Sequence, residues 1–324
     1  MWANIQAMLA AMTRDGVYTI TENRAPISGA AGADGYGYAE NGATFIDNYR
    51  NVLYINEGSA QGVYWTPVNL FQRNLLSWHS DFRDGAGIVV SDTAALYTNP
   101  ATGIKIFGQG LAETDSGFVV AIAEDGAIGT LTTTDENAHV AAIGVGLTTS
   151  VPFQPDAHGP MVVDALFAVD AALTLRRVFV GFIGTAADAL DPPVTGATVT
   201  LTLVQDDVAG MMFDAGLTDA AGIMLPHNKS DEAATILVTD TAMGAVDTDV
   251  DSAAFGVYQR WRVEVLANGT MKAFKNKVLI GTITTALDVD EEVAPVLLVG
   301  STTTATKAIL VKHFSTWGQR NGVL

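Results

Sequence analysis

Short runs of β-favouring residues, separated by turn-forming residues, fill most of this chain and limit its possible folds more than any other feature. Val, Ile, Phe, Leu and Thr recur in runs that Gly, Asp, Asn or Pro interrupt, a punctuation typical of strands joined by tight turns. The predicted strands are Gly87–Val90, Ile104–Phe107, Phe118–Ala123, Ala138–Val145, Met161–Val169, Arg177–Ile183, Thr198–Val204, Thr235–Thr239, Trp261–Leu266, Met271–Phe274, Val278–Thr284, Val296–Val299 and Lys307–Phe314. Long helical patterns are nearly absent, so the sequence predicts an all-β protein.

One turn has a specific local signature. The strand-like run Trp261–Ala267 is followed by Asn268-Gly269 and then by a second run, Thr270–Phe274. Asn-Gly accepts the positive φ angles of a type I′ turn, which matches the twist of paired strands. We therefore expect a β-hairpin here.

The N-terminal part differs from the rest of the chain. Trp2, Ile5, Met8, Leu9 and Met12 recur at helical spacing and predict one apolar stripe on a short helix, before an extended arm. The Gly-rich part of this arm, Gly29–Gly42, is either flexible or closely packed. The stripe either folds back on its own domain or contacts another subunit, and the second role is favoured because an arm follows it. Phe45, Tyr54 and Trp65 belong to a small aromatic hairpin that could form a very small core.

Length and pattern together predict two parts. Residues 1–68 would form the helix, arm and aromatic hairpin, and residues 69–324 would form one β-sandwich. A sandwich of that size is within the usual range, since such domains often reach roughly 200–250 residues as one unit.

Composition excludes several kinds of partner. The net charge is −18, and the 17 Lys and Arg residues form no basic run, which argues against nucleic acid. No stretch approaches the length of an apolar membrane span, and no signal peptide is recognisable, so no membrane partner is expected. Because there is no cysteine, disulfides and thiolate metal sites are excluded.

A search for catalytic chemistry finds little. The common nucleotide, esterase and zinc-protease motifs are missing, and the five histidines are scattered along the sequence. The acidic run Asp288–Glu292 resembles a solvated turn more than the alternating carboxylates of a glycosidase. We therefore expect neither an enzyme nor a cofactor.

One acidic stretch offers a weak metal candidate. Asp247, Asp249 and Asp251 alternate as at the start of a calcium-binding loop, but the Gly and the closing Glu of such a loop are missing. An exposed acidic loop is the favoured interpretation, with calcium binding as the alternative.

Two segments resemble known families. The Gly-rich lead, Phe45-Ile46-Asp47, Leu53–Gly58 and Tyr64–Val68 together resemble a segment near the N-termini of phage head and other virion proteins. The Trp-led hairpin, the strand Val278–Gly281 and the end of the chain near Phe314 and Trp317 are similar to the final strands of concanavalin-like, or laminin-G-like, jelly rolls. This second resemblance covers roughly residues 75–320.

These resemblances imply a structural protein of a tailed-phage particle. The leading hypothesis is a capsid decoration or cement protein on the virion surface, made in the host cytoplasm, whose partners are the major capsid protein and two copies of itself in a homotrimer. Its contact residues would be Trp2, Ile5, Met8, Leu9, Met12, Phe45, Tyr54 and Trp65. The alternative is a receptor- or glycan-binding tail protein with a lectin-like sandwich, and a glycan-cleaving enzyme is a weaker third possibility.

Overall fold

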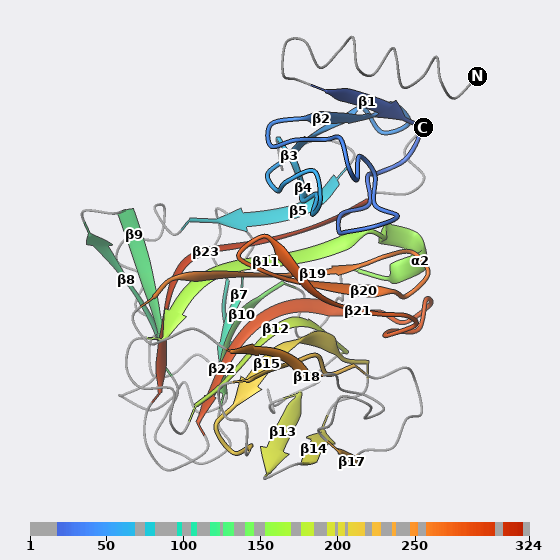
Figure 1. The fold of residues 1–324 in the computed structure, drawn as a ribbon. Coiled ribbons are helices and arrows are strands. Elements are labelled where there is room, and N and C mark those ends of the chain that lie inside the picture. The colour runs from blue at the N-terminus through green and yellow to red at the C-terminus, as the bar shows by residue number, and fades with distance from the viewer. Residues whose placement is uncertain are drawn as a thin grey trace. The chain divides into compact units, whose positions relative to one another are not determined.

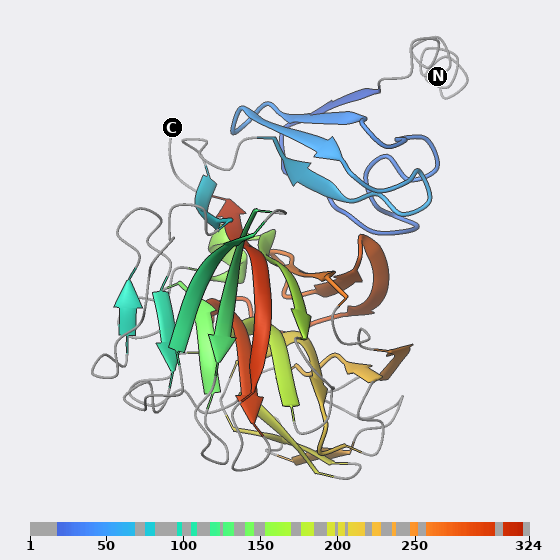
Figure 2. The same ribbon diagram turned by 90° about the vertical axis from the view of Figure 1, so that its left-hand side faces the viewer.

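The computed structural model of the chain describes residues 18–68, 75–81, 96–98, 105–108, 117–123, 126–132, 140–145, 153–169, 176–184, 193–197, 200–204, 207–217, 222–227, 235–237, 247–251, 257–301 and 307–319. It divides into two compact units (Figures 1 and 2). Unit 1 comprises Met1–Leu76, Lys277–Leu279 and Gln319–Leu324, and unit 2 comprises Ser77–Asn276 and Ile280–Gly318. Unit 1 thus extends beyond the predicted boundary after Val68.

Unit 1 is built on a four-stranded sheet. Its strands follow the order β1 (Thr19–Glu22), β2 (Thr44–Asp47), β3 (Val52–Asn56) and β4 (Trp65–Pro67). The β1–β2 pair is parallel, whereas β2–β3 and β3–β4 are antiparallel. Asp47 ends β2 by accepting the backbone N–H groups of Tyr49 and Arg50, which tightens the turn into β3. The small aromatic hairpin that the sequence predicts is therefore confirmed for β2 and β3.

An aromatic cluster forms the interior of unit 1. The Phe45 ring lies 5.7 Å from that of Trp65 and 6.4 Å from that of Tyr54, both edge-on. All three side chains are buried, and Ala33, Ala39 and Ala43 complete the same cluster. The aromatic side chains thus form the small core that the sequence predicts for them.

The Gly-rich segment is a packed loop, which agrees with the closely packed alternative and not with the flexible one. Asp34 holds it in place by accepting hydrogen bonds of 2.6 Å from both terminal nitrogens of Arg24, while its carbonyl accepts the indole N–H of Trp65. Gly35 has a φ of +82°, and a Cβ there would contact Ala39 and Trp65. Glycine is needed at this position because the loop lies directly on the aromatic core.

Unit 2 contains two eight-stranded sheets. The front sheet has the order β21-β20-β19-β11-β23-β9-β8, with β5 paired to β23, and the back sheet has the order β18-β16-β15-β12-β22-β10-β7-β6. Front-sheet bounds are β5 (Leu75–Ser80), β8 (Gly117–Ala123), β9 (Gly126–Thr132), β11 (Met161–Val169), β19 (Gln259–Val265), β20 (Met271–Lys275), β21 (Val278–Ile283) and β23 (Ala308–Gln319). Back-sheet bounds are β6 (Leu96–Thr98), β7 (Lys105–Gly108), β10 (Val140–Gly144), β12 (Arg176–Ile183), β15 (Ala209–Asp214), β16 (Gly222–Met224), β18 (Asp247–Asp251) and β22 (Ala294–Ser301).

The two sheets pack face to face as a β-sandwich. Trp261 of the front sheet lies 6.3 Å from Phe213 of the back sheet and 5.2 Å from Phe167 on the neighbouring strand, ring centre to ring centre. Alternate residues of β11, β19, β12 and β15 point into this interior, as strand geometry requires. The predicted all-β, jelly-roll type of sandwich is confirmed. Among the described residues, no helix has the length and apolar character needed to cross a membrane.

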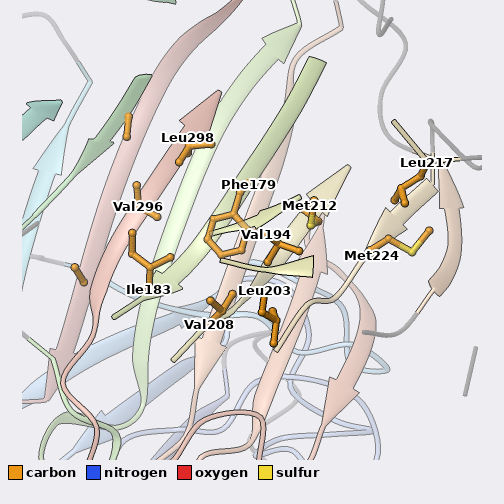
Figure 3. Close-up of a cluster of buried hydrophobic side chains, with 12 residues drawn as sticks. Phe179, Ile183, Val194, Leu203, Val208, Met212, Leu217, Met224, Val296 and Leu298 are labelled. Atoms are coloured by element: carbon orange, nitrogen blue, oxygen red, sulfur yellow. The ribbon is translucent and has the colours of Figure 1, made fainter. Parts of the chain in front are cut away.

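A third layer covers the other side of the back sheet. The small sheet of β13 (Val194–Ala197), β14 (Thr200–Leu203) and β17 (Thr235–Leu237) contributes Val194 and Leu203 to a cluster with Phe179, Met212 and Leu298 (Figure 3). The back sheet is therefore buried on both faces, with apolar residues on each. The only helix in the described part of the chain, α2 (Pro155–His158), is one turn long.

The predicted Asn-Gly hairpin is present, with a different turn. Val265 pairs with Met271, and only Gly269 of the Asn-Gly pair has a positive φ, at +74°. The Gly269 N–H donates to the Leu266 carbonyl, and the Thr270 carbonyl accepts from Leu266. The connection is therefore longer than the two residues of a type I′ turn, which needs positive φ at both positions.

We expect Gly210→Ala to destabilise the sandwich. Gly210 lies opposite Gly181 in the β12–β15 pair, and a Cβ on Gly210 would come within 2.5 Å of Phe179 Cε2 and 2.8 Å of the Val180 carbonyl. Overpacking of this kind costs about 1–3 kcal/mol. Chemical denaturation of the full chain measures the loss. Gly62→Ala is the control, because its new methyl would meet only Ser59 Oγ at 3.9 Å, and equal stability of both variants would contradict the packing described.

Candidate functional site: a polar face on the front sheet

The front sheet has a second face, turned away from the sandwich interior. Asp164 on β11 lies opposite Arg262 on β19 and opposite Ser315 on β23. Because side chains alternate along a strand, these three share the face that does not carry Trp261 and Phe167. We call this surface the polar face, and it belongs entirely to unit 2.

One end of the polar face is a buried ion pair. Arg262 and Glu264, two residues apart on β19, form a salt bridge, and their side chains are only 2% and 3% exposed. The Arg262 guanidinium also lies 4.9 Å above the Trp317 ring. A buried pair gains little net stability, because desolvation offsets most of its attraction. A gain in folding stability therefore does not explain why the Arg262–Glu264 pair is buried at this position.

Asp164 is fully buried at the centre of the face. Arg260 Nε donates to both of its carboxylate oxygens, at 2.7 and 3.0 Å. Burial alone would raise the pKa of Asp164, but the charge and hydrogen bond of Arg260 outweigh it and hold that pKa below its ordinary value. Asp164 is therefore a permanent carboxylate that orients the Arg260 head group.

Two histidines that are far apart in the sequence meet at this face. The rings of His79, on β5, and His313, on β23, lie 4.8 Å apart, and His313 Nε2 shares a 3.0 Å hydrogen bond with Ser315 Oγ. Burial lowers the pKa of His313 to about 4, although the Asp164 charge opposes that shift. Burial likewise lowers the pKa of His79. Both rings are consequently neutral at neutral pH, and the expectation of scattered, isolated histidines is corrected for this pair.

An irregularity in β23 brings a lysine to the same face. Leu166 pairs with His313 whereas Phe167 pairs with Val311, so Lys312 is the extra residue of a β-bulge. Its Nζ lies 4.1 Å from the centre of the Tyr258 ring, a cation–π contact at the start of β19. Bulges redirect side chains and are frequent near functional sites.

The accessible end of the polar face combines an aromatic ring with hydrogen-bonding groups. Its partly exposed members are Tyr258, Arg260, Lys312 and His79, and the largely buried His313 ring lies beside them. Ser315, by contrast, is 1% exposed, so its hydroxyl is not presented to a ligand in this structure. Among the residues described, no group of three or more histidines and carboxylates is arranged to hold a metal ion. The face is suited to binding a polar organic ligand.

The site residues expected from the sequence lie elsewhere. Phe45, Tyr54 and Trp65 are inside unit 1, with 0%, 3% and 1% exposure, so the described chain does not present them as a surface. Their contact with another subunit stays a prediction. The stripe residues Trp2, Ile5, Met8, Leu9 and Met12 lie outside the described residues.

The weak calcium candidates have a definite backbone position. Asp247, Asp249 and Asp251 lie in β18, which pairs with β16, and not in the expected acidic loop. Their side chains are outside the described part, so calcium binding stays a prediction.

Sequence reasoning missed every member of the polar face. The available signal was alternation on β19, where Arg260, Arg262 and Glu264 alternate with Trp261, Val263 and Val265. A strand with one polar side usually just faces water, so this pattern does not by itself indicate a site.

Comparison with known proteins finds similarity only among solved structures. No protein-family model matches the chain, and no curated protein matches it. A protein of unknown function from Shewanella oneidensis MR-1 aligns with a TM-score of 0.48 at 7% identity, over 78% of this chain and 89% of the other. The carbohydrate esterase of the Shiga toxin-encoding bacteriophage phi24B aligns with a TM-score of 0.37 at 11% identity, over 66% and 90%.

The endo-β-1,4-glucuronan lyase of the fungus Trichoderma reesei aligns with a TM-score of 0.41 at 9% identity, over 65% of this chain and 88% of the lyase. Similarity at this level assigns no family. It does correct one expectation from the sequence. The exclusion of enzymatic activity is wrong as stated, because a carbohydrate esterase and a glucuronan lyase are among the structures similar to this chain.

We expect the stability of the protein to fall as the pH drops from about 6.5 to about 4, and His313→Gln to reduce that fall. The unfolded chain binds a proton at the ordinary histidine pKa, whereas folded His313 does so only near pH 4. The stabilisation from this group is therefore complete above pH 6.5 and is lost on acidification, with a magnitude on the order of 3 kcal/mol. Urea unfolding at several pH values measures it.

Two comparisons separate the effect of burying the His313 ring from the effects of its hydrogen bond and of the other histidines. Ser315→Ala removes the hydrogen-bond partner but keeps the buried imidazole, so it should retain the pH dependence of the parent protein. His79 and His158, whose pKa values burial also lowers, account for the dependence that remains in His313→Gln. An unchanged pH dependence in His313→Gln would show that His313 is not desolvated as described.

Proposed function

We propose that this chain is a carbohydrate-binding protein of a tailed-phage particle and that it binds glycan at the half-exposed end of the polar face. The observation that carries the proposal is the gathering of Tyr258, Lys312, Arg260 and the two histidines on paired strands. Sugars have hydroxyl groups that donate and accept hydrogen bonds, and flat C–H surfaces that pack on aromatic rings. An aromatic ring beside several fixed polar groups is complementary to both.

The support behind these groups favours binding. Arg260 is oriented by a fully buried carboxylate, and Lys312 is directed by a bulge in a central strand. Side chains held in this way lose little conformational freedom when a ligand binds, so less of the contact energy is spent on ordering them. Two of the similar structures are carbohydrate enzymes, but the proposal rests on the residues of this chain.

We expect Tyr258→Ala to weaken glycan binding about tenfold or more, since loss of an aromatic contact of about 1.4 kcal/mol corresponds to a factor of ten. A glycan array with the wild-type protein identifies ligands, and calorimetry then compares the variants. Val257→Ala is the matched control, because Val257 is the adjacent residue and its side chain is 54% exposed. Equal affinities of Tyr258→Ala and the wild type would place the binding site elsewhere.

The second part of the proposal concerns unit 1 and how the protein is attached to the particle. We propose that unit 1 attaches the protein to the major capsid protein as a decoration or cement protein, in a homotrimer, as the resemblance of residues 29–68 to virion proteins implies. The observation that favours this is an apolar strip on the unit 1 sheet. Leu53 is 38% exposed, and Ile46, directly opposite it on β2, and Ile55 are half-buried on the same side. That side lies opposite the one occupied by Phe45 and Tyr54.

We expect Leu53→Asp to abolish binding to head shells, because it places a charge in the middle of this strip and so makes its burial costly. Co-sedimentation of purified protein with undecorated heads measures the effect. Val289→Asp is the control, since Val289 is a similarly exposed aliphatic residue of unit 2, at 40%. Full occupancy of heads by Leu53→Asp would exclude this strip as the attachment surface.

A further inference from the structure

The charge of the polar face is opposite to that of the chain as a whole. The protein carries 35 acidic and 17 basic residues, for a net charge of −18. On the described part of the face and at its β5 edge, Arg260, Arg262, Lys272 and Lys312 outnumber Asp81, Asp164 and Glu264. Local excess of one sign against a strong background of the other is an electrostatic feature of ligand recognition.

Burial strengthens this contrast at the accessible end. Asp164 and Glu264 are 0% and 2% exposed, and each is already held by an arginine of the same face. Arg260, with 23% of its side chain exposed, and Lys312 are half-exposed. Asp81, at the end of β5, is the half-exposed carboxylate within electrostatic reach of His79 and His313. A ligand therefore meets mainly hydrogen-bond donors and positive charge.

We propose that the glycan bound here is acidic, with a sugar carboxylate between Lys312 and Arg260 while the ring lies against Tyr258. This inference rests on the proposed glycan binding and specifies its ligand class. Tyr258 is two residues before Arg260, and Lys312 contacts the Tyr258 ring, so the three groups are neighbours. A carboxylate accepts charge-assisted hydrogen bonds from both cations, which a neutral sugar hydroxyl matches only with weaker bonds.

The test compares acidic sugars with their own neutral forms. Oligosaccharides of galacturonate, glucuronate and mannuronate are measured by calorimetry beside their carboxyl-reduced products, which keep the hydroxyl groups and lose the charge. We expect the wild-type protein to bind at least one acidic oligosaccharide about tenfold or more tightly than its reduced form, with a preference that falls as salt rises.

Variants at Lys312 test whether the preference for acidic oligosaccharides depends on the polar face. In Lys312→Gln, the preference for the acidic form over its own reduced form should fall well below that of the wild type, because only Arg260 then meets the carboxylate. Lys312→Arg should retain the preference for the acidic form. Circular dichroism confirms that each variant is folded.

The outcomes distinguish this inference from the proposed function. Binding of the reduced or other neutral glycans with no preference for the acid overturns the acidic-ligand proposal and leaves glycan binding intact. A full preference in Lys312→Gln also overturns it. Absence of binding to every acidic and neutral glycan tested overturns the proposed function itself.

Discussion

The packing of Trp261 between Phe167 and Phe213 is the contact on which the rest of unit 2 depends. It fixes the register of β19 against β11 and joins the two sheets of the sandwich. Because side chains alternate with a period of two, a slip of one residue would move Trp261 out and bring Arg260 or Arg262 into the apolar interior. The same contact therefore determines which residues form the core and which form the polar face.

That constraint creates a second requirement on the outer side of the sheet. The central strands of the front sheet are largely buried on both faces, and on the outer one the buried groups include charges. Each buried charge must be neutralised locally, which Arg262 does for Glu264 and Arg260 does for Asp164. The partly exposed end, where the side chains of Arg260 and Lys312 reach the surface, is the part that we propose for a ligand.

Local signals in the sequence predicted local structure. The strand pattern, the hairpin at Asn268-Gly269 and the aromatic core of residues 45–65 all follow from spacing and turn residues. The structure contains them, apart from the predicted strand Gly87–Val90, which lies outside the described residues. The Gly-rich stretch stayed open between a flexible and a closely packed form, because composition cannot show that Asp34 is held by Arg24 and by the Trp65 indole. The small sheet over the back sheet was missed, since strands were predicted for β14 and β17 but not for β13, and nothing local showed where they would pack.

The polar face was beyond prediction because it depends on which strands become neighbours. Asp164 and Arg260 are 96 residues apart, and His79 and His313 are further apart still. No local pattern marks one as the partner of the other, and each residue by itself resembles an ordinary solvent-facing position. Only the order β19-β11-β23, with β5 added beside β23, brings them together.

The buried charges give a physical reason for regarding this face as functional. Replacing a buried ion pair by well-packed apolar residues is often neutral or stabilising, so folding alone does not require Arg262–Glu264 or Asp164–Arg260. If the outer side of the front sheet served only for packing, apolar residues would be enough there. The outer side of the back sheet is packed in this way, with Phe179, Met212 and Leu298. The front sheet instead retains fixed charges and neutral imidazoles beside an aromatic ring. These oriented polar groups contribute little to stability, and Tyr258, Arg260 and Lys312 are the members of the group that reach the surface beside one another, which is why the glycan-binding proposal is centred on them.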